Sequence, residues 1–217
     1  MPAIRRLARE LVTGAAVAMF VYHAAWLLRK PKDVRHLRPD EVAAISEAPG
    51  ARLVFEGAHR DTLTVFLSYR CPYCAGLYSD IVRPDAPRAV IVRHVALNAS
   101  TIEAQAAVAA ECARRYDRFH SYSYALFAKR DSVGSLPWVS FAVQAGIRDT
   151  SGFMRCVESR LPLPVVLDDI SLARRLGVPG TPALAWRRRL VIGPVRVAAL
   201  LSELEEGLRR GPADVTR

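Results

Sequence analysis

The chain has few cysteines and no repeated or compositionally biased segment. Four cysteines among 217 residues are too few for a disulfide scaffold. There is one C-x-x-C pair, with neither a second such pair nor an H-x-x-x-H pattern, so a four-ligand zinc site of the usual spacing is absent. Acidic residues are also in the minority, 21 against 31 basic ones, which gives a net charge of +10.

The excess positive charge is dispersed in short arginine clusters. No aromatic residues alternate with these clusters, and no DNA-reading motif accompanies them. The charge is therefore typical of ordinary solvated faces, and no nucleic-acid partner is expected. Basic clusters next to a membrane segment would instead favour contact with anionic lipid.

Residues 11–28 form a long stretch without a formal charge, flanked on both sides by basic residues. As a helix this stretch would span about 27 Å, close to the ~30 Å hydrocarbon core of a bilayer. It predicts one uncleaved transmembrane anchor after a cytoplasmic N-terminus of residues 1–10. A cleavable signal peptide is the alternative, because Ala16-Val-Ala18 has the small-residue spacing of a cleavage site.

The apolar patterns after the anchor predict a single α/β domain. Residues 29–50 are expected to be a polar linker with a short helix starting near Asp40, residues 51–210 the domain and residues 211–217 a tail. Two β-branched runs, residues 51–55 and 62–67, predict strands joined as a hairpin. The remaining predicted elements are strands at 89–97, 182–186 and 190–192, a helical insertion at about 101–176 with one stretch from 101 to 130, and a closing helix at 195–208.

Two cysteines stand where a buried strand passes into a helix. The run of residues 62–67 ends at Ser68, and Cys71-Pro-Tyr-Cys74 follows, before apolar residues at helical spacing. Pro72 would begin the helix, where its missing N–H costs nothing. Cys71 would then face the unpaired N–H groups and the positive dipole end of the helix. In C-x-x-C enzymes such a position lowers a thiol pKa from ~8.5 to between ~3.5 and ~7.

The spacing also predicts different roles for the two cysteines. Cys71 would attack or be attacked, and Cys74, one turn further into the helix, would resolve the mixed disulfide. The alternative is one half of a zinc site, because C-x-x-C is also metal-ligand spacing. The two remaining cysteines stand singly, so redox chemistry is favoured and no metal is expected.

Two motifs, in this order, resemble the thioredoxin superfamily. One is the strand–Cys71-Pro-Tyr-Cys74–helix unit, and the other is Gly-Val-Pro-Gly-Thr181-Pro182 before a strand. The interval of 107 residues between Cys74 and Pro182 is similar to that of the DsbA-like thiol–disulfide oxidoreductases, which carry a helical subdomain there. The resemblance covers about residues 52–208 and implies a thioredoxin-like fold with a helical insertion.

The resemblance also implies where a substrate binds. A cis peptide bond between Thr181 and Pro182 would lie opposite Cys71. The Thr181 backbone would pair with an extended polypeptide as an added strand. Pro72 and Tyr73, between the two cysteines, complete the expected substrate-binding residues.

Two positions depart from the pattern of the family. The dipeptide Pro72-Tyr73 is similar to that of glutaredoxins, and this dipeptide tunes the stability of the thiolate. Six residues before Cys71, where the superfamily often has an acidic residue, this chain has Val65. No buried carboxylate is expected at that position to move the proton of the resolving thiol.

Cys112 and Cys156 fall in two separate helices of the predicted insertion. In one interpretation each is a small buried core residue. In the other they form a disulfide, as in some DsbA-like proteins, which would stabilise the domain by about 4 kcal/mol in the chain-entropy account.

These features together predict a membrane-anchored protein thiol–disulfide oxidoreductase. Its substrates would be cysteine-containing polypeptides, no bound cofactor is implied, and a membrane redox partner would reset the cysteine pair. An oxidase of exported proteins is favoured. A glutaredoxin-like reductase or isomerase, and a redox-inactive binding or chaperone module, are the alternatives.

The predicted location follows from cysteine use rather than from charge. The segment after residue 28 is at least as rich in lysine and arginine as the one before residue 11. Charge alone therefore permits a cytoplasmic domain. A disulfide in the insertion, however, would rarely form in a reducing cytosol. We therefore expect a single-pass protein of the bacterial inner membrane, with its catalytic domain in the periplasm or another extracytoplasmic space.

Overall fold

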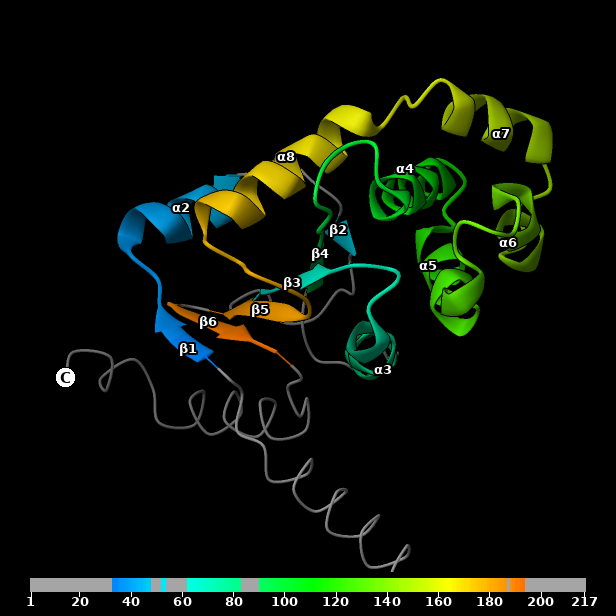
Figure 1. Cartoon of the computed structure of the whole chain (residues 1–217). Helices are drawn as coiled ribbons and strands as arrows, with labels where there is room; N and C mark the ends of the chain where they lie inside the picture. The colour runs from blue at the N-terminus through cyan, green and yellow to red at the C-terminus, as the bar shows by residue number, and fades with distance from the viewer. Residues whose placement is uncertain (1–32, 48–51, 54–61, 83–89, 187, 194–217) are drawn as a thin grey trace, which may run out of the picture. The chain divides into compact units, whose positions relative to one another are not determined.

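A six-stranded mixed sheet and a group of helices make up the part of the chain that the computed structural model describes, residues 33–47, 52–53, 62–82, 90–186 and 188–193 (Figure 1). The strands are β1 (Asp33–His36), β2 (Arg52–Leu53), β3 (Leu63–Leu67), β4 (Val90–His94), β5 (Ala183–Trp186) and β6 (Arg189–Ile192). The helices are α2 (Pro39–Glu47), α3 (Pro72–Ile81), α4 (Ile102–Arg114), α5 (Phe119–Ala128), a short 3-10 turn (Arg130–Ser132), α6 (Trp138–Gln144), α7 (Thr150–Glu158) and α8 (Leu163–Arg175).

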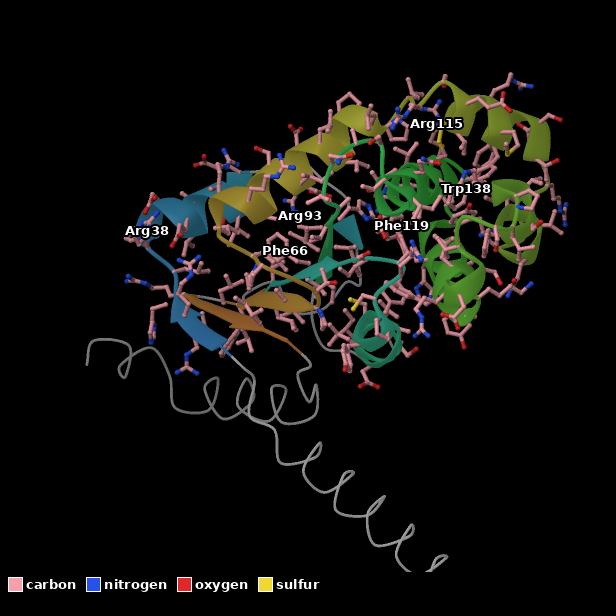
Figure 2. The ribbon with its side chains drawn as sticks, in the orientation of Figure 1. Arg38, Phe66, Arg93, Arg115, Phe119 and Trp138 are labelled. Carbon is pink, nitrogen blue, oxygen red and sulfur yellow. A yellow bond between two sulfur atoms is a disulfide. The ribbon has the colours of Figure 1, made fainter. Side chains whose placement is uncertain are left out.

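The central strand of the sheet is β3, in the order β1-β6-β5-β3-β4-β2. β3 and β4 are parallel, and the other neighbouring strands are antiparallel. All five residues of β3 are buried, because helices cover both of its faces. Leu63, Val65 and Leu67 pack in one apolar cluster with residues of α3 to α8, whereas Phe66 packs in a second cluster with residues of α8, between the sheet and that helix (Figure 2). The predicted α/β class with a helical insertion is confirmed.

Helices α4 to α7 form the inserted subdomain and pack on one another. Cys112 of α4 and Cys156 of α7 are joined by a disulfide, with their Cα atoms 5.9 Å apart. The structure therefore has the bonded pair rather than two separate core thiols. Because the cysteines are 44 residues apart in the sequence, closing this loop stabilises the domain by about 4 kcal/mol in the chain-entropy account.

The prediction of a polar linker over residues 29–50 is wrong at β1, whereas the short helix expected near Asp40 is found as α2. β1 pairs with β6 at the edge of the sheet, with Val34 opposite Val191, and α2 follows it. Leu37, between the two elements, is only 1% exposed. A four-residue edge strand is too short to produce a periodic signal, so only the pairing partner reveals it.

The predicted hairpin of residues 51–55 and 62–67 is also wrong. β2 pairs with β4, with Arg52 opposite Ile91, and does not touch β3. Both edges of β3 are already occupied, by β4 and β5. A short connection between two β-branched runs therefore does not show that the two strands pair with each other.

Helical spacing between residues 101 and 130 belongs to two helices rather than one. α4 and α5 are separated by a turn in which Asp117 adopts a left-handed backbone conformation, with φ at 55°. The predicted closing helix at 195–208 and the predicted anchor at 11–28 lie outside the described residues. In the part of the chain that is described, none of the helices is both long and apolar enough to cross a membrane.

Two consecutive residues of β4 make buried side-chain contacts with carboxylates on opposite faces of the sheet, as the alternation of a strand requires. Arg93 Nη1 donates to Asp169 Oδ1 of α8 at 3.0 Å, and Figure 2 shows Arg93 on the side of the sheet that faces α8. His94 Nε2 lies 2.9 Å from Glu111 Oε1 of α4, and the His94 N–H donates to Asp169 Oδ2 at 3.0 Å. β4 is thereby tied to the helices on both faces.

Glu111 remains ionised although its side chain is buried. Burial alone would raise the pKa of this carboxyl group. Hydrogen bonds from His94 and from Arg114, whose Nε donates to Glu111 Oε2 at 2.8 Å, outweigh burial and hold the pKa of Glu111 at about 2.

We predict that Glu111 makes the stability of the domain depend on pH in the acidic range. Its folded-state pKa of about 2 lies below the ordinary value of 4.5. The carboxylate therefore stabilises the fold above that ordinary value, and this contribution is lost as the pH falls towards 2. Glu111→Gln should be less stable than the wild type at about pH 6, and the gap should narrow at about pH 3.

Urea unfolding of both proteins at the two pH values measures this gap. Asp131→Asn is the matched control, because it removes a carboxylate whose side chain is 88% exposed. A gap between wild type and Glu111→Gln that does not change with pH would contradict the prediction.

Candidate redox site

The site is built on the first residue of the redox helix. Cys71 is the N-cap of α3, with an extended backbone, and Pro72 occupies the first turn as predicted. The Cys71 N–H donates to the Ser68 carbonyl at 3.1 Å, and the Cys74 N–H donates to Cys71 Sγ at 3.2 Å. The sulfur of Cys71 thus takes the place of the side-chain oxygen that usually caps a helix N-terminus.

Thr181 reaches Cys71 from a distant part of the sequence. β5 runs antiparallel to β3 with Ala183 opposite Phe66, so the residues before β5 meet the residues after β3 at one edge of the sheet. The peptide bond between Thr181 and Pro182 is cis, as the resemblance implied. The Cys71 thiol donates to the Thr181 carbonyl over 3.3 Å.

The hydrogen bonds that Cys71 Sγ accepts favour its thiolate form. A hydrogen bond from the Cys74 thiol makes the largest contribution. Partial burial opposes it, but further hydrogen bonds from the Thr181 side chain and from the backbone N–H groups of Cys74 and Tyr73 also act on Cys71. Together they lower the pKa of Cys71 from 9.0 to about 6. At neutral pH roughly nine-tenths of a thiol with such a pKa is ionised.

Cys74 has the opposite character. Its side chain is fully buried, and burial together with its hydrogen bond to Cys71 raises the pKa of Cys74 far above the ordinary value. The two cysteines are not bonded to each other in this structure. One thiol is therefore partly accessible and acidic, and the other is shielded and stays protonated.

The residues between and before the cysteines differ in exposure. Tyr73 is 49% exposed and Pro72 is also exposed, so both lie at the surface beside Cys71. Arg70 forms an ion pair with Glu103 of α4 at 3.6 Å, which directs its charge towards the helical subdomain. Val65 is fully buried, in an apolar cluster.

A metal site finds no support among the described residues. They contain no group of three or more histidine, cysteine or acidic side chains placed to hold an ion. The buried contacts of Arg93 and His94 described above were not predicted from the sequence. Histidine and carboxylates at unrelated positions carried no spacing signal, and the pairing of β4 with α4 and α8 was needed to find them.

An acidic thiol at a helix start, a shielded partner thiol and a cis-proline loop, set in a sheet with a helical insertion, define a thiol–disulfide oxidoreductase. The family model described as thioredoxin matches residues 56–206, so the chain belongs to the thioredoxin family. A search of curated proteins finds no match.

Solved structures of similar fold include a thiol-disulfide exchange protein and thioredoxin-like proteins. The thiol-disulfide exchange protein α-DsbA2 of Wolbachia pipientis superposes with a TM-score of 0.66 at 19% identity, covering 77% of this chain and 94% of that one. A thioredoxin-like oxidoreductase of Silicibacter pomeroyi gives a TM-score of 0.59 at 25% identity, covering 72% and 89%. A periplasmic thioredoxin-like protein of Salmonella enterica serovar Typhimurium gives 0.57 at 24% identity, covering 79% and 98%.

We predict that alkylation of the reduced protein by iodoacetamide modifies Cys71 and spares Cys74. Its rate should rise through a midpoint near pH 6, because only the thiolate reacts. Cys74→Ala removes the hydrogen-bond donor with the largest effect on Cys71, so the midpoint should move to higher pH. Cys74→Ser keeps a donor and should move it less.

Mass spectrometry of the alkylated peptide at a series of pH values provides the measurement. An ordinary thiol midpoint for Cys71 in the wild type, or equal shifts in the two Cys74 variants, would count against this account of the site.

Proposed function

We propose that this protein oxidises cysteine-containing polypeptides, with Cys71 as the reacting cysteine and Cys74 as the resolving one. The observation that carries the proposal is the position of Cys71 at the N-cap of α3, where the Cys74 N–H donates to Cys71 Sγ at 3.2 Å and the pKa of Cys71 is lowered to about 6. A stabilised thiolate favours the reduced form, which makes the disulfide form a better oxidant. A pKa of about 6 lies between ~7 for thioredoxin and ~3.5 for the strongly oxidising DsbA.

Oxidation begins when a substrate thiolate attacks Cys71 Sγ of the Cys71–Cys74 disulfide. The bond between the two cysteines breaks, and Cys74 leaves with the electron pair and takes up a proton, which its raised pKa favours. A second substrate thiolate then attacks the substrate sulfur of the mixed disulfide. Cys71 leaves as a thiolate and the substrate departs with a disulfide. The cysteine pair has gained two electrons, so a redox partner, for which we propose a membrane protein, must reoxidise it.

The substrate would lie along the Thr181 backbone, beside the reacting sulfur. Thr181 is half-buried, and Pro72 and Tyr73, next to Cys71 in the chain, are exposed. An extended polypeptide placed along Thr181 can pair with its backbone and present its cysteine to Cys71. Backbone pairing requires no particular side chains, which suits an enzyme that accepts many substrates.

A glutaredoxin-like reductase or isomerase is the second candidate. The pKa of Cys71 is closer to that of thioredoxin, a reductant, than to that of DsbA. The Pro72-Tyr73 dipeptide, which is similar to that of glutaredoxins, favours the same candidate. Equilibration of the cysteine pair with a glutathione buffer distinguishes them, because an oxidase requires a less negative reduction potential than its substrates.

The proposed location is extracytoplasmic, with residues 11–28 as a single anchor in the inner membrane. The disulfide of the helical subdomain supports an oxidising compartment, where such bonds persist. The similar protein of Salmonella enterica is periplasmic. Because β1 begins at Asp33, four residues, 29–32, remain between the proposed anchor and the folded domain.

We predict that Cys71→Ser abolishes oxidation of a dithiol peptide, whereas Cys74→Ser accumulates mixed disulfides with substrates. Without Cys74 the intermediate on Cys71 loses the intramolecular route by which it is resolved. Non-reducing gels of cells that express each variant measure the trapped complexes. Equal trapping by the two variants would reverse or remove the assigned roles.

We also predict that Cys71 is accessible from outside the cytoplasm. A membrane-impermeant maleimide should label it on intact spheroplasts after mild reduction, and the Cys71→Ser/Cys74→Ser variant should show only background labelling. Labelling that appears only after lysis would place the domain in the cytoplasm and favour the reductase.

A further inference from the structure

The charged residues of the segment 33–47 meet the end of α8. Arg35 Nη1 donates to both carboxylate oxygens of Glu41, at 2.9 and 3.0 Å, and Arg35 Nη2 donates to the carbonyl of Leu176. The Glu41 side chain is 6% exposed and also accepts from the Arg38 N–H at 2.9 Å. One guanidinium thus joins α2 to the C-terminal end of α8, beside which α2 lies in Figure 1.

That end of α8 is where the loop carrying Thr181 begins. Leu176 is the C-cap, and Gly177 follows in the left-handed conformation with φ at 60°. The Val178 N–H donates to the Ala173 carbonyl and the Gly177 N–H to the Arg174 carbonyl, both at 2.9 Å, the pattern of a Schellman motif. The Leu176 carbonyl has no partner within the helix, and Arg35 supplies one.

Apolar contacts of the same segment reach the other end of the loop. Leu37 belongs to one buried cluster with Leu176, where the loop starts, and Ala183, where β5 starts. Val178, within the loop, packs against this cluster. The Leu37 N–H also donates to the Arg188 carbonyl at 2.7 Å. The segment 33–47 therefore supports both ends of the loop that contains Thr181.

We propose that Arg35 and Glu41 are positioning residues for thiol–disulfide exchange. They hold the start of the Thr181 loop, and through it they set the contact between the Thr181 carbonyl and Cys71 Sγ, 3.3 Å long. This inference rests on the proposed function, since it assigns a role in the same reaction. It extends the working site to a segment that precedes residues 56–206, the part matched by the family model.

We call the contacts of Arg35 with Glu41 and with the Leu176 carbonyl the clamp. Loss of this clamp should have two separable effects. A loop that is less well held pairs less well with an extended substrate, because part of the binding free energy must then order the loop. The Thr181 side chain also contacts Cys71 for less of the time, so the thiolate loses part of the hydrogen bonding that this side chain provides. No reacting atom is removed, so the chemical step itself should change little.

The test uses the full-length protein with two clamp variants and a matched control. Arg35→Met keeps the aliphatic stem and removes the donors, and Glu41→Gln removes the charge that orients Arg35. Asp40→Asn makes the same carboxylate-to-amide change one residue earlier, at a side chain that is 69% exposed and bonded only to Arg38 among the interactions described. Thr181→Val lacks the hydroxyl group. It shows how far the pH midpoint of Cys71 alkylation moves when the Thr181 side chain no longer donates to Cys71.

We expect both clamp variants to raise KM for a dithiol peptide about threefold to tenfold, with kcat within about twofold of the wild type. The pH midpoint of Cys71 alkylation should rise in the same direction as in Thr181→Val. Asp40→Asn should behave as the wild type in both measurements. Circular dichroism at the assay temperature establishes that each variant is folded, and Arg35→Lys replaces Arg35→Met if the latter is not.

Unchanged KM and an unchanged alkylation midpoint in Glu41→Gln would overturn the inference, as would the same changes in Asp40→Asn. The alkylation midpoint does not depend on oxidase activity. If the wild type fails to oxidise peptides, the proposed function fails, while the effect of the clamp on Cys71 is still decided by that midpoint.

Discussion

The site depends on one constraint, which is that the sulfur of Cys71 must lie both at the start of α3 and against the Thr181 carbonyl. The two residues are 110 positions apart in the sequence. The antiparallel pairing of β3 with β5 brings them together, because β3 leads into the redox helix and β5 follows the cis-proline loop. A shift of one residue in that register would reverse the side chains of β5 and separate the two contacts. The position of Cys71 against Thr181 is therefore a property of the sheet as much as of the helix.

Helices α4 and α8 are attached to this sheet by buried polar contacts as well as by apolar ones. Arg93 and Asp169 are both almost inaccessible to solvent, and so are His94 and Glu111. Removing one member of the buried Arg93–Asp169 ion pair leaves an uncompensated charge, which typically costs about 3–5 kcal/mol. β4 is the parallel neighbour of β3, so these pairs also hold the strand beside the one that carries the redox helix. A rigid support of this kind favours a site that keeps its geometry while substrates change.

Local patterns in the sequence were sufficient to predict helices and strands, but not to predict which strands pair with each other. The five apolar or β-branched residues of β3 and the proline after Cys71 predicted a buried strand and a helix start, and both are found there. The two motifs together predicted the fold. The hairpin of residues 51–55 and 62–67 failed, because β-branched runs show that a strand exists without showing which edge accepts it. The linker prediction failed at residues 33–36 for a related reason, since a short edge strand is defined by its partner.

By itself the sequence determined that one cysteine would stand at a helix N-terminus with the second a turn behind it, since caps and helical periods act over a few residues. It also determined, through the motif before β5, that a proline loop would belong to the same site. Only the tertiary structure decided that Thr181 touches Cys71, that Cys112 bonds to Cys156, and that Arg35 holds the end of α8. Each of these contacts joins residues 44 to 141 positions apart. Contacts of that range depend on register and packing, which no local pattern encodes.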